Sequence, residues 1–381
     1  MIRLSRSIVG KAEADAVARV LVEDGYLGMG AEVQKLEAEI AAFLGVEPKQ
    51  VCCVSSGTAA VQLGVQAVTE PGDEVLVQSL TFIATFQAIS GVGAVPVPCE
   101  VRPETMTIDL KDAERRITPK TKAIVPVHYA SYPGDLDAIY DFASRHNLRV
   151  VEDAAHAFGC TYKGRLIGSF GDVACFSFDG IKNITCGEGG AIVARDPETL
   201  AIASDSRLLG VQKDAEKRYA GQRSWEFDVT RQGFRYHMSN IMAAIGRVQL
   251  QRFPNEFSRS RVTLAERYRQ GLAGIPNVML LETDLGPVIP HIQPIRITGG
   301  LRDTVREALE AAGVQTGIHY KPNHLLTLYG GGSVSLPVTE QLYEELLSLP
   351  LHPGISEQDV DLVCRTILDT VRRQKTEDRR R

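Results

Sequence analysis

The order of apolar and polar positions along the chain predicts alternating strands and helices. Two amphipathic segments with helical spacing come first, at residues 11–23 and 33–44. Short apolar runs then alternate with helical patterns. Strands are expected at 51–55, 74–78, 94–98, 122–128, 149–153, 172–177 and 191–194, and helices at 58–68, 82–90, 135–146 and 240–251. Near-continuous apolar strands in this order indicate an α/β fold with a mostly parallel sheet and helices on both faces.

A break after the helix at 240–251, marked by Pro254, is the expected end of the sheet domain. We therefore assign residues 1–252 to a large α/β domain that includes the N-terminal helices, and residues 253–381 to a smaller α+β domain. Its expected elements are strands at 289–297 and 314–320 and helices at 303–312, 340–348 and 357–372. The polar segment 210–233 has weak periodicity, so it is either disordered or functional.

Composition narrows the function classes. The chain has 381 residues, 44% of them apolar and 23% charged, which is ordinary for a globular protein. A net charge of −5 without a broad basic block argues against nucleic acid as a partner. The chain has no apolar run of membrane-spanning length and no apolar core of signal-peptide length, so we expect a cytoplasmic protein without a membrane partner. Seven scattered cysteines fit a reducing compartment, and no Cys or His spacing matches a zinc site.

Two residues suggest a specific chemistry. Lys182 lies in a loop that follows an apolar run and precedes a Gly-Glu-Gly-Gly turn, and Asp153 ends the buried run expected as a strand. A lysine near a buried carboxylate in an α/β protein suggests Schiff-base chemistry on a pyridine cofactor. A pyridinium N–H would satisfy the buried carboxylate and make the ring an electron sink. Taken alone, Lys182 would be read as a surface lysine.

Other candidates fall where expected strands end. Gly57 and Thr58 follow the first strand of the sheet and open a helix, whose free N–H groups attract an anion; a simple helix cap is the alternative. Ser177 ends another expected strand, and its hydroxyl could bind the same anion, which would be a phosphate group. Phe82 would stack on a flat ring or serve as a core aromatic. His156 would hydrogen-bond a ring hydroxyl or play a structural part.

Together, several stretches closely resemble the DegT/DnrJ/EryC1/StrS family, the nucleotide-sugar aminotransferases of the fold type I pyridoxal-phosphate group. They are SSGTAAV, SLTFIATFQAI, ITPKTKAIVPVHYASYPGDLDAI, VEDAAHAFGCTYKG, GDVACFSFDGIKNITCGEGGAIV, GFRYHMSNIMAAIGRVQL and SLPLHPGISEQDVDLV. The resemblance covers essentially the whole chain. It implies a seven-stranded-type sheet, pyridoxal 5'-phosphate as cofactor, and transfer of an amino group from an amino acid, with L-glutamate expected, to a nucleotide-linked keto sugar.

The resemblance also implies a role for each candidate residue. Lys182 matches the lysine that bonds covalently to the cofactor, Asp153 the acid at the pyridine nitrogen, and His156 the contact to the ring oxygen. The remaining matches are the aromatic that stacks on the ring and the phosphate contacts, which are Phe82, Gly57, Thr58 and Ser177.

The resemblance further implies a homodimer with active sites at the subunit interface. In the family, a residue of the neighbouring subunit reaches the phosphate from a motif like GxNYRM. Here the motif reads GFRYHM, with Arg235 where Asn is common and His237 in place of the usual Arg. Arginine binds phosphate as a charge, so the contact is expected with an altered geometry.

The stretch GIHYKPNHLL is similar to a substrate-side segment of the family, which makes His319, Tyr320 and His324 candidates for sugar contacts. Packing in a turn around Pro322 is the alternative. The expected acceptor is a 4-keto-6-deoxy hexose, used for amino sugars of surface glycans such as lipopolysaccharide O-antigen or of antibiotics, and a 3-keto sugar stays open. Some relatives carry His in place of the lysine and act as sugar dehydratases, so Lys182 favours transamination. A non-catalytic regulatory protein would not need this lysine.

Overall fold

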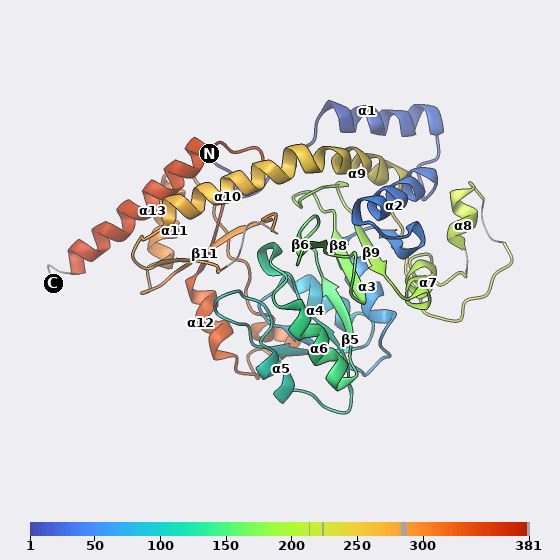
Figure 1. Ribbon diagram of the computed structural model, residues 1–381, viewed down its shortest axis with the longest axis horizontal. Coiled ribbons are helices and arrows are strands. Elements are labelled where there is room, and N and C mark those ends of the chain that lie inside the picture. Colours follow the sequence, from blue (N-terminus) through green and yellow to red (C-terminus); the bar gives the residue numbers. More distant parts are fainter. Residues whose placement is uncertain (213, 223–224, 283–287, 379–381) are drawn as a thin grey trace.

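A seven-stranded sheet forms the centre of the molecule in the computed structural model, which describes residues 1–212, 214–222, 225–282 and 288–378 (Figure 1). The strand order is β1-β9-β8-β5-β4-β2-β3. Its members are β1 (Val51–Val54), β2 (Glu74–Gln78), β3 (Val95–Cys99), β4 (Thr121–Val125), β5 (Arg149–Asp153), β8 (Val173–Ser177) and β9 (Gly190–Ala194). Only β9 runs antiparallel to its neighbours within this sheet, which confirms the mostly parallel arrangement.

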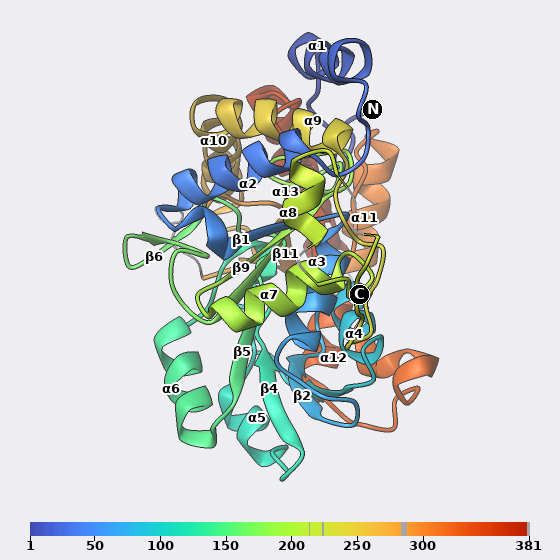
Figure 2. The same ribbon diagram turned by 90° about the vertical axis from the view of Figure 1, so that its right-hand side faces the viewer.

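Helices cover both faces of this sheet because successive strand residues point to opposite sides. In β5, for example, Val150 belongs to one buried apolar cluster and Val151 to the other. The helices of the first face are α2 (Ala31–Leu44), α5 (Leu110–Arg115), α6 (Leu136–His146) and α9 (Asn240–Arg252), and those of the second are α3 (Gly57–Gln66), α4 (Ile83–Ser90) and α7 (Pro197–Ser206). Figure 2 shows α6 on one side of β5 and α3 on the other.

Smaller elements surround this core. Helix α1 (Lys11–Arg19) continues into a π-helical turn at Val20–Asp24 and packs on α9 through Ala16 and Ala244. The remaining elements are the hairpin of β6 (Thr161–Tyr162) and β7 (Arg165–Leu166), helix α8 (Asp214–Tyr219), and the 3-10 turns Pro48–Gln50, Tyr129–Ser131, Asn323–Leu325 and Thr327–Tyr329. Helix α8 lies in the polar segment 210–233, of which residues 213 and 223–224 lie outside the described residues.

The C-terminal part builds an antiparallel three-stranded sheet of its own. It consists of β10 (Val278–Leu280), β11 (Gln293–Ile297) and β12 (Leu346–Leu349), covered by α10 (Ser258–Leu272), α11 (Arg302–Ala311) and α13 (Glu357–Asp378). Helices α9 and α10 form one long rod in Figure 1, joined by a π-helical turn at Phe253–Phe257. The expected domain limit at residue 252 falls inside this rod and stays a prediction. The chain's start joins this C-terminal part, since Ile2 pairs with Val314.

One expected strand is wrong, and one expected helix has different bounds. Residues 314–320 form no strand and contribute only isolated bridges at Val314 and Gly317. The helix expected at 340–348 is α12 (Pro337–Glu345), which stops before β12. Residues 346–349 pair with β11 and are buried, so tertiary pairing overrides a pattern that locally continues the helix.

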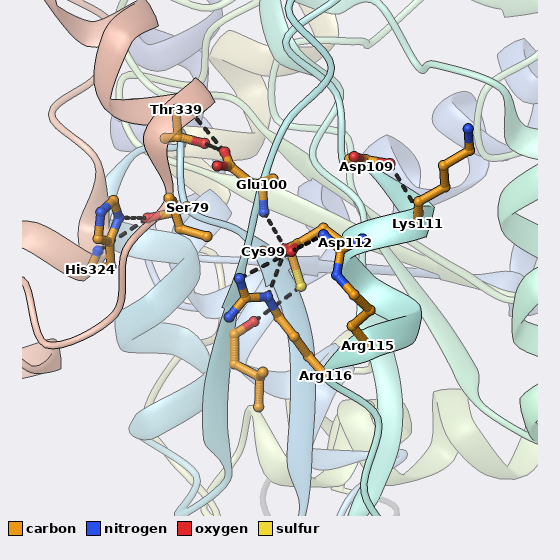
Figure 3. Close-up of polar contacts among 12 residues, drawn as sticks. Ser79, Cys99, Glu100, Asp109, Lys111, Asp112, Arg115, Arg116, His324 and Thr339 are labelled. Carbon is orange, nitrogen blue, oxygen red and sulfur yellow. Dashed lines mark hydrogen bonds and ion pairs between the residues drawn. The ribbon is translucent and has the colours of Figure 1, made fainter.

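Helix α12 is fastened to the edge of the large sheet. Glu100, which follows β3, accepts hydrogen bonds from the backbone N–H of Val338 at 3.0 Å and of Thr339 at 2.9 Å, and from the Thr339 hydroxyl at 2.6 Å (Figure 3). The Glu100 carboxylate thus caps the first turn of α12. No helix among the residues described here is both long and apolar enough to span a bilayer.

Candidate active site

A cavity of about 400 Å³ opens where the parallel strands of the large sheet end. Segments that follow β1, β2, β5 and β8 line it, because the carboxyl ends of parallel strands meet at one edge. The C-terminal part supplies a further wall. The lining side chains with chemical interest are Ser56, Thr58, Thr81, Phe82, Thr85, Asp153, His156, Ser177, Asp179, Lys182, Glu188, His291, His319 and Tyr320.

One corner of the cavity is shaped for an anion. Helix α3 begins at Gly57, and the Ser56 side chain caps it by accepting from Ala59 N at 3.1 Å. A Cβ atom on Gly57 would lie 2.5 Å from Ser177 Cβ and 2.8 Å from Ser177 Oγ. Only glycine therefore lets the first turn of α3 lie against Ser177. Backbone N–H groups at a helix start beside a hydroxyl suit a phosphate.

Asp153 is nearly fully buried at the end of β5 and is held by neighbouring donors. Its carboxylate accepts the Thr85 hydroxyl at 2.7 Å and Ala155 N at 3.2 Å. The Thr85 hydroxyl lies 3.1 Å from that of Thr81, which is equally buried. These contacts fix the orientation of the carboxylate.

Lys182 lies in a tight turn after β8, in which its N–H donates to Asp179 O at 3.1 Å. Its Nζ lies 3.4 Å from His291 Nε2. Burial lowers the pKa of Lys182 to about 8, against the opposing pull of the Asp179 and Asp153 charges. About a tenth of the amine is therefore neutral at pH 7, far more than for an exposed lysine.

Two buried histidines flank this amine. The rings of His156 and His291 lie 4.5 Å apart between centroids, and His156 Nε2 lies 3.2 Å from the Tyr320 hydroxyl. Burial first, and the Lys182 charge second, hold the pKa of both imidazoles well below the ordinary value. Both rings are therefore neutral at pH 7. His156 Nδ1 is buried and has no partner among the described residues, so a ligand atom would satisfy it.

Most of the candidates from sequence share this cavity. Phe82 is 55% exposed and its ring centroid lies 5.6 Å from that of Tyr320, which rules out its alternative as a core aromatic. Those that line the cavity are Gly57, Thr58, Phe82, Asp153, His156, Ser177, Lys182, His319 and Tyr320.

Two candidates lie elsewhere. Arg235 is exposed and does not line the cavity of its own chain, and its backbone pairs with Leu208. His324 is fully buried outside the lining, and its Nδ1 lies 2.8 Å from the Ser79 hydroxyl (Figure 3). Its Nε2 lies 3.2 Å from Glu340. The structure thus corrects the expectation for His324, because its ring fastens the 3-10 turn at Asn323–Leu325 and cannot reach a ligand.

Sequence reasoning missed several lining residues, of which Thr81, Thr85 and His291 make contacts with Asp153, with Lys182 or with each other. Thr81 and Thr85 stand in a stretch whose only visible signal was the aromatic between them. His291 falls inside a segment expected as a strand, and no motif marks it. Its place beside Lys182 depends on how the C-terminal part packs against the sheet.

The comparisons agree with this architecture. The model of the DegT/DnrJ/EryC1/StrS aminotransferase family matches residues 8–368. The chain is 36% identical over 369 residues to a dTDP-4-dehydro-2,3,6-trideoxy-D-glucose 4-aminotransferase of Saccharopolyspora spinosa, covering 96% of this chain and 95% of that protein. The aminotransferase TlmJ of Streptoalloteichus hindustanus has a TM-score of 0.90 at 35% identity, covering 98% and 100%. The PLP form of the putative sugar aminotransferase Spr1654 of Streptococcus pneumoniae has a TM-score of 0.88 at 29% identity, covering 97% and 98%.

Proposed function

The chain belongs to the DegT/DnrJ/EryC1/StrS aminotransferase family, and we propose that it aminates a keto group of a nucleotide-linked sugar, with L-glutamate as the donor. It is an aminotransferase that depends on pyridoxal 5'-phosphate. Our preferred acceptor is a 4-keto-6-deoxy hexose, supported by the relative from Saccharopolyspora spinosa, which is named as a 4-aminotransferase. Amination at a 3-keto group is the alternative.

The residues present fit the cofactor. The corner where the start of α3 at Gly57 lies against Ser177 suits a phosphate, and Thr58 adds a hydroxyl. We assign Asp153 to the pyridine nitrogen and the unpartnered Nδ1 of His156 to a ring oxygen. Exposed Phe82 is placed to stack on the ring. The cavity volume of about 400 Å³ lies in the range of small-molecule sites.

In the proposed reaction the chain's own side chains move and hold protons. When bound, the cofactor supplies an electron sink for the negative charge that develops at the donor's Cα. Lys182 Nζ would take the proton from the donor's Cα and deliver it to the cofactor carbon that carries the nitrogen. Its pKa of about 8 suits both steps near neutral pH. Asp153, fixed by Thr85, keeps the proton on the ring nitrogen.

On the substrate side we assign His319 and Tyr320 to the sugar. His319 Nδ1 lies 2.8 Å from the Ser348 hydroxyl, which fixes the ring at the cavity wall. Burial lowers the pKa of His319 to about 4, so the ring is neutral when the enzyme works. A neutral imidazole and a phenol suit hydroxyl groups of a sugar.

The charge of the cavity supports a second subunit in the site. Lys182 is the only Lys or Arg among the described residues that line it, against three carboxylates at Asp153, Asp179 and Glu188. A phosphate dianion in such a site requires further positive charge. We propose that Arg235, exposed and outside its own cavity, supplies it to the partner's site in a homodimer.

We place the reaction in the cytoplasm, in the synthesis of amino sugars for surface glycans such as O-antigen or for antibiotics. The relatives from Saccharopolyspora spinosa and Streptococcus pneumoniae are both named as sugar aminotransferases, the second as a putative one. All seven cysteines are buried and unpaired, which fits a reducing compartment.

The proposal is tested with purified protein, pyridoxal phosphate, glutamate and a matched pair of dTDP-linked 4-keto and 3-keto 6-deoxy hexoses. We expect 2-oxoglutarate and a 4-amino sugar in equal amounts from the first substrate. The Lys182→Ala variant should lose this turnover, and Lys182→Arg, which keeps the charge, should lose it as well. Sugar dehydration without consumption of glutamate would indicate a dehydratase, and turnover retained by Lys182→Ala would refute the mechanism.

A further inference from the structure

Within the described part of the chain, His291 is the one imidazole in hydrogen-bond contact with the amine of Lys182. Its Nε2 lies 3.4 Å from Lys182 Nζ, and the residue is only 4% exposed. It belongs to the segment before β11, so the C-terminal part of the chain brings it to an amine that follows β8. No other feature of the segment marks it for function.

The backbone of His291 is held on both sides. Its N–H donates to the Ser131 hydroxyl at 2.9 Å, and its carbonyl accepts from Arg261 Nη1 at 3.0 Å. Ser131 Oγ also donates to the carbonyl of His156, which links the two histidines. Ser131 and Arg261 are themselves fully buried or nearly so. The ring packed against His156 therefore has a fixed position relative to the amine.

The protonation state of this pair follows from burial. His291 is neutral at pH 7, because burial and the neighbouring positive charges lower its pKa far below the ordinary value. A neutral imidazole has one acceptor nitrogen, whereas an ammonium has only donors. Facing the charged amine, Nε2 is therefore the acceptor; the ring proton then lies on Nδ1, which is buried without a partner among the described residues.

We propose that His291 is a positioning residue, which accepts a hydrogen bond from the Lys182 amine and holds it in place whenever that amine is not bonded to the cofactor. A lysine has a flexible four-carbon stem, and proton transfer depends steeply on the position of the donor and acceptor. The freed amine must stay within reach of two carbon atoms in succession. A fixed neutral acceptor restrains Nζ without adding a competing charge.

The role in catalysis rests on the proposed function, but the contact itself does not. It can be measured in cofactor-free protein through the ionisation of Lys182. The other charged or titratable groups that face this amine come from its own loop, from β5 and the segment after it, from α10 and from the C-terminal part. They are Asp179, Glu188, Asp153, His156, Arg261, His319 and Tyr320.

The test is competitive acetylation of cofactor-free protein across pH 6 to 11, with the labelled Lys182 peptide quantified by mass spectrometry. The His291→Phe variant keeps a ring of similar size but removes the acceptor. We expect its labelling midpoint to fall by about one to two pH units relative to wild type, because the ammonium loses a hydrogen bond while it stays buried. His291→Gln offers an amide oxygen and should stay within about half a pH unit of wild type.

Kinetics supply a second readout. In the loaded enzyme, His291→Phe should lower kcat about tenfold with little change in KM, and His291→Gln should recover most of it. His146→Phe, on α6 and outside the cavity lining, is the matched control and should change neither measurement. If His291→Phe does not fold by circular dichroism, the smaller His291→Leu carries the same expectation.

An unchanged labelling midpoint in the apolar variant would overturn the proposal, as would a glutamine variant that behaves like phenylalanine. A failure of the proposed function would look different. The protein would then aminate no keto sugar in the panel, while the labelling midpoints would still separate the acceptor-bearing from the acceptor-free variants.

Discussion

A single methyl group at Gly57 is expected to damage the phosphate corner of the site. In Gly57→Ala the new Cβ would lie 2.5 Å from Ser177 Cβ, 2.8 Å from its Oγ and 3.1 Å from its Cα. Ordinary carbon contacts begin near about 3.5 Å, so α3 and β8 must separate by roughly 1 Å. Ser177 cannot yield easily, because it is a buried residue of β8 paired with Gly190.

The size of the effect follows from the cost of overpacking. Extra atoms in a well-packed site cost about 1–3 kcal/mol. Because the separation of α3 from β8 displaces the N–H groups that would bind the phosphate, the affinity for pyridoxal phosphate should fall roughly 5- to 150-fold. Pyridoxal, which lacks the phosphate, should lose much less affinity, because Asp153 and Lys182 lie at other walls of the cavity.

The assay is a spectroscopic titration of cofactor-free protein with each of the two compounds. Gly28→Ala serves as the control, since the nearest atoms to a Cβ there belong to the Tyr26 side chain at 3.7 Å and the backbone is not left-handed. An affinity for pyridoxal phosphate within twofold of wild type would refute the assignment of this corner. Equal losses for both compounds would show that the methyl group disturbs the whole cavity and not the phosphate contact.

The remaining predictions concern charge and packing. Asp153→Asn keeps the shape but removes the charge, and should lower kcat by about 10²–10³-fold, the equivalent of about 3–4 kcal/mol for the loss of a buried ionic contact; an unchanged kcat contradicts the role of Asp153. A lowered pKa leaves more of the Lys182 amine neutral at a given pH, so its bonding to added pyridoxal phosphate, followed by stopped-flow absorbance, should accelerate about tenfold per pH unit up to about pH 8 and then level off; a midpoint above pH 10 would show an unburied amine. His324→Ala should cost about 1–3 kcal/mol of stability in urea unfolding, since Ser79 and Glu340 lose their partner, while KM for the sugar stays the same; a raised KM without loss of stability would return His324 to the substrate site.

Strand positions in the large sheet could be predicted closely because burial on both faces leaves an unambiguous apolar signature. The strands at 74–78 and 149–153 have the bounds that the pattern gives. Helix α10 shows the opposite case. Its buried Leu264, Ala265, Tyr268 and Leu272 lie on one helix face, but most of its other residues are polar and Arg261 stands on the same face, so the helix was not predicted. The buried face of α10 packs against β11, β12 and α13, and the sequence of α10 alone does not reveal these distant partners.

The same distinction separates the site residues. Lys182 and Asp153 could be placed together because Asp153 ends one parallel strand and Lys182 follows another, and the carboxyl ends of such strands share an edge. His319 and His324 come from one short stretch, yet one lines the cavity and the other is buried beside Ser79. Composition and spacing treat the two histidines alike. The path of the turn around Pro322 decides between them, and that path depends on contacts with distant segments.

The electrostatics of the cavity depend on side chains that come from distant parts of the chain. Three imidazoles surround one amine, and burial lowers the pKa of each: to about 4 for His319, and well below the ordinary value for His156 and His291. Lys182, with a pKa of about 8, is therefore the first of the four groups to take up a proton as the pH falls. Between these values the cluster holds a single proton, and that proton lies on Lys182. Neutral histidines thus allow the lysine to ionise near physiological pH, because protonated neighbours would push its pKa lower still and leave it unable to carry a proton between two carbon atoms.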